Sequence, residues 1–87
     1  MKKIYFVSQQ WSLNGETSVE FSDAFLSKED CRTELKDLVS YELAESQYVS
    51  DYDTYKKRWS NADAWLAEDR MTGDWVMFRV EFIDLHE

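Results

Sequence analysis

The dipeptide Asn14-Gly15 constrains the fold of this chain more than any other feature of its sequence. It lies between two stretches in which apolar and polar side chains alternate, residues 3–11 and 17–25. A two-residue type I′ turn requires a positive φ angle at both central positions, and Asn followed by Gly tolerates this best. We therefore expect an N-terminal β-hairpin in which Leu13 lies opposite Glu16.

This register divides the side chains of the hairpin between two faces, because residues two apart on a strand point the same way. One face is apolar and is expected to pack in the core: Ile4, Phe6, Val19, Phe21 and Phe25. The other mixes apolar with polar residues and is expected to be partly exposed: Tyr5, Val7, Gln9, Trp11, Ser18, Glu20 and Ser22.

A helix is predicted from Ser27 to about Glu45. Ser27 can accept a hydrogen bond from a free backbone N–H of the first turn, and Glu29 and Asp30 suit the positive end of the helix dipole. One side of this helix is apolar: Cys31, Leu35, Leu38, Val39 and Leu43. On that side Cys31 is interpreted as a small buried hydrophobe rather than as a reactive thiol.

A second helix is predicted to begin at Ser50, since aromatic residues follow at helical spacing. These either pack on the sheet or form in part an exposed aromatic patch: Tyr48, Tyr52, Tyr55 and Trp59. Residues 61–71 are rich in good helix formers but precede Thr72-Gly73, which suits a hairpin turn. A helix is favoured there, and a strand stays open.

Residues 74–85 are the clearest strand, with Val76, Phe78, Val80 and Phe82 alternating onto one face. The whole pattern predicts an α+β fold in the order β-β-α-α-(α or β)-β. We expect residues 1–87 to form one compact acidic domain. Its antiparallel sheet, made of the N-terminal hairpin and the long C-terminal strand, would be packed with two or three helices.

The sequence carries no catalytic signature. It has one cysteine and one histidine, His86, so thiolate zinc sites and Ser-His or Cys-His constellations are not expected. The two glycines lie too far apart for a phosphate-binding loop, and 87 residues leave little room for a cleft. We expect a protein that is not an enzyme, with no cofactor and no metal.

Charge is the informative property. Eighteen acids stand against ten bases, for a net charge of −8, and residues 29–53 hold eight of the acids with only Arg32 and Lys36. This balance argues against direct binding to nucleic acid or to anionic membranes. No apolar run is long enough for a membrane span or a signal peptide, so a cytoplasmic protein is expected.

Four acids and one tyrosine of the predicted helix form a row, with spacings of four, three, four and four: Asp30, Glu34, Asp37, Tyr41 and Glu45. Such a row extends about 22 Å at a rise of about 1.5 Å per residue. It is either an ordinary solvated face or a surface shaped to enter a basic groove. In the second interpretation the partner-binding set also includes Tyr48, Asp51 and Asp53.

In size and composition, though in no residue motif, the chain resembles small acidic inhibitors. These include phage-borne antagonists of restriction or CRISPR nucleases and immunity proteins that block nuclease toxins. The resemblance implies a basic nucleic-acid-handling partner, such as a nuclease, in which carboxylates would take the place of phosphates.

A second hypothesis is a non-catalytic interaction module, or a small acidic subunit, that docks through exposed aromatic residues. The candidates are Trp11, Trp59, Trp65 and Trp75. The sequence also leaves a homodimer open, through the mixed face of the hairpin or through the last strand as a sheet edge.

Overall fold

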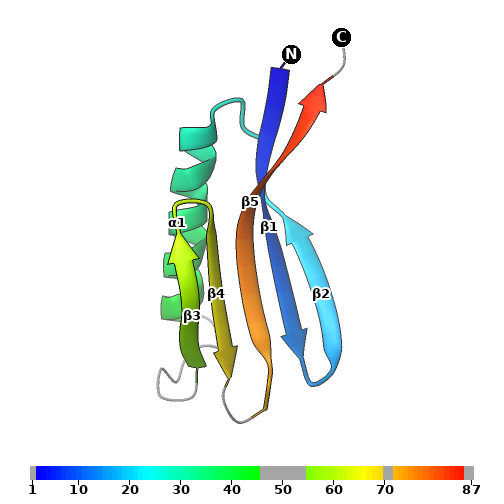
Figure 1. Ribbon diagram of the computed structural model, residues 1–87, viewed down its shortest axis with the longest axis vertical. Coiled ribbons are helices and arrows are strands. Elements are labelled where there is room, and N and C mark those ends of the chain that lie inside the picture. Colours follow the sequence, from blue (N-terminus) through cyan, green and yellow to red (C-terminus); the bar gives the residue numbers. More distant parts are fainter. Residues whose placement is uncertain (1, 46–54, 70–71, 86–87) are drawn as a thin grey trace.

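The computed structural model describes residues 2–45, 55–69 and 72–85. For residues 45, 55–60 and 69 it describes the backbone but not the side chains. Its elements are β1 (Lys2–Leu13), β2 (Glu16–Phe21), α1 (Lys28–Glu45), β3 (Tyr55–Asn61), β4 (Ala64–Asp69) and β5 (Trp75–Leu85). The strands form one antiparallel sheet in the order β2-β1-β5-β4-β3, and α1 packs on one face of it (Figure 1). The α+β class is confirmed.

The predicted hairpin turn is confirmed. Asn14 and Gly15 adopt φ angles of 55° and 81°, and Leu13 pairs with Glu16. The turn is also tied to the loop before β5, because the backbone N–H of Asn14 donates to Oδ1 of Asp74 at 3.0 Å. The tip of the hairpin is therefore anchored to a segment 60 residues away.

The predicted first helix is confirmed as well. Oγ of Ser27 accepts a hydrogen bond from the backbone N–H of Asp30 at 3.3 Å, which satisfies a donor of the first turn. Cys31 and Leu35 are buried, and Leu38, Val39 and Leu43 pack partly against the same core. The apolar side of the helix thus faces the sheet as its spacing indicated.

The helices predicted after α1 are wrong where the structure describes them. Tyr55–Asn61 is β3, with a bulge between Lys57 and Trp59, so Tyr55 and Trp59 belong to no helical stripe. Residues 50–54 lie outside the described part. Ala64–Asp69 is β4, which pairs with β3 on one side and β5 on the other.

Long-range pairing explains why β4 is a strand despite its good helix formers. Its neighbours supply backbone hydrogen bonds along both edges, and Trp65 and Ala67 alternate into the core with 4% and 2% exposure. Context of this kind routinely overrides helix propensity. The described residues therefore follow the order β-β-α-β-β-β, with one helix where two or three were expected.

The assignment of the two hairpin faces is also wrong. Val7 is fully buried under α1 and Trp11 packs on the core, whereas Phe21 is 65% exposed on the opposite face. The reason is a change of register after β2: Tyr5 bridges Phe25, so Phe25 turns to the helix side and the chain enters α1 there. Both faces of β1 are apolar, and local alternation therefore cannot choose between them.

The core lies between α1 and the centre of the sheet. Phe78 of β5 is fully buried and its ring lies edge-on to Trp11 at 5.6 Å and tilted to Trp65 at 5.3 Å. Because β5 lies between β1 and β4, it is not a sheet edge, and the expected dimer contact through that edge is wrong. In the described residues no helix is long and apolar enough to cross a membrane.

Candidate protein-binding surface

The helical part of the predicted partner-binding set lies on one flank of α1. Asp30 and Asp37 are exposed, Glu34 is half-buried, and Tyr41 is 65% exposed. Glu45 ends the helix, and its side chain is not described. Tyr48, Asp51 and Asp53 lie outside the described residues. We call Asp30, Glu34, Asp37 and Tyr41 the acidic flank.

The basic residues of α1 occupy the other flank. Nε of Arg32 donates to Oδ1 of Asp63 at 2.7 Å, and Nζ of Lys28 lies 3.7 Å from Oδ2 of the same carboxylate. Asp63 stands in the turn between β3 and β4, so these contacts hold the cations toward that turn. Within the described residues, Glu34 and Asp37 form no ion pair, and the acidic flank is not neutralised.

The contact with Arg32 also favours the charged form of Asp63. The hydrogen bond from Arg32 lowers the pKa of this carboxyl below its ordinary value of 3.8, with Lys28 contributing to the same effect. The pKa of Arg32 is raised by its hydrogen bonds to Asp63 and Glu29. These charges form a local network on the basic flank, and none of these described cations pairs with the acidic flank.

One acid of the helix has a structural role instead. Glu42 is only 7% exposed, and its Oε1 accepts a hydrogen bond from Nε1 of Trp11 at 3.2 Å. It fixes α1 over β1 and is not available to a partner. Among the described acids of α1, Glu42 is therefore a buried anchor, Glu29 pairs with Arg32, and Asp30, Glu34 and Asp37 form the acidic flank.

Two further acids that sequence reasoning missed share the helix side of the sheet. In the β1–β2 register Glu20 lies opposite Gln9 and Glu16 opposite Leu13, so both alternate away from Val19 and Phe21. Both acids are exposed. Their position in the hairpin could be read from the alternation, but the side on which α1 packs could not.

Comparison with known proteins gives no relative. No protein-family model, curated protein or solved structure matches this chain. Within the described residues, no three His, Cys, Asp or Glu side chains are grouped so that they could hold a metal ion. The candidate surface therefore rests on its own geometry and charge.

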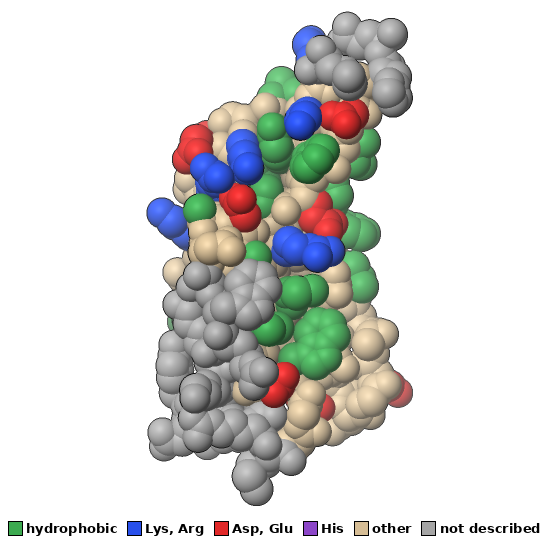
Figure 2. Space-filling view, viewed as in Figure 1, with side chains coloured by type: hydrophobic (Ala, Val, Ile, Leu, Met, Phe, Trp, Pro, Cys, Tyr) green, Lys and Arg blue, Asp and Glu red, His purple; other side chains and the backbone are tan. Residues whose placement is uncertain are grey.

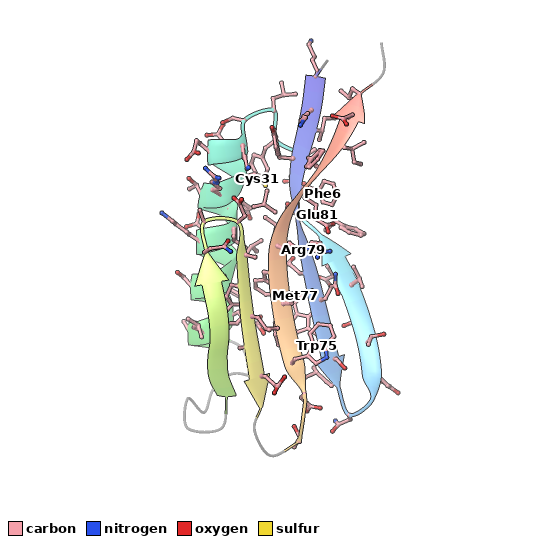
Figure 3. All side chains as sticks on the ribbon, viewed as in Figure 1. Phe6, Cys31, Trp75, Met77, Arg79 and Glu81 are labelled. Carbon is pink, nitrogen blue, oxygen red and sulfur yellow. The ribbon has the colours of Figure 1, made fainter. Side chains whose placement is uncertain are left out.

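The four tryptophans of the second hypothesis differ in burial. Trp65 is buried and Trp11 is part of the core packing, so neither can dock a partner. The side chain of Trp59 is not described. Trp75 is half-buried on the sheet face away from α1, in line with Met77, Arg79 and Glu81 along β5 (Figure 3).

Proposed function

We propose that this protein is a non-catalytic, cytoplasmic inhibitor that binds a basic nucleic-acid-handling protein, such as a nuclease, through the acidic flank of α1. The observation that carries the proposal is the row of Asp30, Glu34 and Asp37, which has no ion pair among the described residues, beside the exposed Tyr41. Asp30 and Asp37 are exposed and Glu34 is half-buried. A helix presents such residues on a rigid support, which lowers the entropic cost of binding.

The spacing of the row suits a groove built for phosphates. Helical neighbours three or four residues apart stand about 5–6 Å from one another, so the carboxylates form a regular line of negative charge. A basic groove would attract this line at long range and bind it in place of nucleic acid. Tyr41 would add an aromatic contact of the kind enriched at binding hot spots.

The acidic and basic side chains of α1 lie on different flanks of the helix. Arg32 and Lys28 are held toward the β3–β4 turn by Asp63, while Glu16 and Glu20 add negative charge to the same face of the sheet at the β2 edge. A protein with mixed charges on every face would be soluble without binding a basic partner. This arrangement concentrates the negative potential on one flank.

The test is affinity capture of a partner from cell lysate with two charge-matched variants. The double variant Glu34→Gln, Asp37→Asn removes two of the three negative charges of the acidic flank and leaves the first turn of α1 unchanged. The control Asp23→Asn, Asp84→Asn removes the same charge from exposed positions outside α1. We expect wild type and control to retain a basic nucleic-acid-binding protein that elutes with salt, and the flank variant to lose it.

Equal retention by all three proteins would contradict the proposal. Retention that survives high salt but fails when Trp75 is replaced by Ala would support the aromatic docking module instead, because apolar contacts depend little on ionic strength.

A further inference from the structure

One face of the sheet carries many apolar residues and has no described element packed on it. Along β1, β2 and β5 this open face carries Ile4, Phe6, Val19, Phe21, Trp75, Met77 and Ile83. Phe21, Ile83 and Val19 expose 65%, 56% and 52% of their surface. Figure 2 shows hydrophobic side chains along this view with Lys, Arg, Asp and Glu side chains among them. Contiguous apolar patches of this kind mark interaction sites on soluble proteins.

The open face is close to neutral on a strongly acidic molecule. At its centre Nη2 of Arg79 lies 2.5 Å from Oε1 of Glu81, two positions further along β5. Phe6 stands opposite Glu81 in the register with β1 (Figure 3). The central cation and anion thus balance, whereas α1 carries the excess negative charge. An acidic or a basic partner would find no net charge to recognise here.

From this balance we infer that the open face binds a second copy of the chain. Consider a two-fold axis that lies between the two stacked sheets, perpendicular to β5 and level with Val80. It sets Arg79 against Glu81 of the second copy, and Glu81 against Arg79 of the second copy. The same axis sets Met77 against Ile83 of the second copy. One patch is then complementary to itself in both charge and hydrophobicity, as an isologous dimer requires.

The dimensions of the molecule allow such an interface. It extends 47 Å by 23 Å across the view of the open face. A stable interface needs about 800 Å² from each partner, and this face is large enough to supply it. Two sheets stacked about 10 Å apart would bury the exposed rings. In this dimer α1 lies on the outside of each copy, so both acidic flanks stay accessible.

Sedimentation velocity from about 1 µM to about 500 µM protein tests the inference. We expect a dimer whose dissociation constant falls as salt rises from about 0.03 M to about 0.5 M, because screening reduces the repulsion between two copies of charge −8. Binding through the acidic flank has the opposite salt dependence. The dimer and the proposed function can therefore be refuted separately.

Matched variants locate the interface. Phe21→Lys should weaken the dimer about tenfold or more, because it places a charge among buried rings. Leu26→Lys makes the same charge change at a side chain 76% exposed in the segment before α1, and should leave the dimer intact. Both variants lower the net negative charge, so a loss with Phe21→Lys alone cannot arise from added repulsion.

A charge exchange tests the axis itself. Arg79→Glu should abolish the dimer, and the double variant Arg79→Glu, Glu81→Arg should restore it, because the exchanged charges face each other again. Circular dichroism confirms that each variant is folded. A monomer at every concentration and salt, or equal effects of Phe21→Lys and Leu26→Lys, would overturn the inference.

Discussion

Nε1 of Trp11 donates a hydrogen bond to Oε1 of Glu42 at 3.2 Å, across the junction between β1 and α1. Glu42 is 7% exposed, so this indole is the partner that compensates the burial of its carboxylate oxygen. The edge-on contact of Trp11 with Phe78 fixes the position of the donor. The pair thus links the helix that carries the acidic flank to the centre of the sheet.

Trp11→Phe should destabilise the protein by about 1–3 kcal/mol, because it leaves a buried acceptor without its donor. Glu42→Gln keeps an acceptor oxygen at the same position and should cost less. Urea unfolding of both variants measures the difference. If Glu42→Gln lowers the free energy of unfolding as much as Trp11→Phe does, the hydrogen bond from the indole to the acceptor oxygen is not the source of the stability.

Asp63→Asn should lower the stability by a few tenths to about 1 kcal/mol at neutral pH, the range of solvent-exposed ion pairs, since the Asp63 side chain is 43% exposed. Its native pKa lies below the ordinary 3.8, so its contribution is fully present above that value. The contribution is lost as the pH falls through the native pKa. Unfolding from pH 2 to 7 should show wild type and variant converging in acid; a gap independent of pH would contradict this assignment.

Gly15→Ala should cost about 1–2 kcal/mol, because φ at this position is 81° and a Cβ strains that conformation. No atom lies within 4 Å of the added Cβ, so the loss comes from backbone strain and not from a clash. Asn14→Gly, which tolerates the turn, is the control and should be close to neutral. Thermal unfolding distinguishes them, and equal melting temperatures for wild type and Gly15→Ala would refute the strain argument.

Cys31 should react slowly with Ellman's reagent in the native protein. Burial raises the pKa of its thiol above 9.0, with Glu34 and Asp63 adding to the effect, so little thiolate forms at pH 8. Unfolding in urea should restore ordinary reactivity. A fast native reaction would show that the thiol is accessible and would reopen the reactive interpretation of this residue.

The elements that local sequence signals define were predictable. The Asn14-Gly15 turn, the Ser27 cap and the alternation of β5 each act within a few residues, and all three are confirmed. β3 and β4 were not, because their pairing with each other and with β5 determines their conformation. Propensity alone favoured helix in residues 61–71.

The candidate site was predictable to a similar extent. Helical spacing alone places Asp30, Glu34 and Asp37 in one row, and in the structure Asp30 and Asp37 are exposed while Glu34 is half-buried. The burial of Glu42 against Trp11 depends on contacts 31 residues apart, and no local pattern reveals it. The alternation in the hairpin predicts the open sheet face as the core for the same reason, since only the path of the chain after β2 decides where α1 packs.

The most direct test of the proposed function is displacement of labelled nucleic acid from the captured partner, measured by fluorescence anisotropy. Wild type and the Asp23→Asn, Asp84→Asn control should displace the nucleic acid equally, and less effectively as salt rises. The Glu34→Gln, Asp37→Asn variant should need at least about tenfold more protein, in keeping with the loss of two charged contacts. Equal displacement by the flank variant and the control would contradict the account.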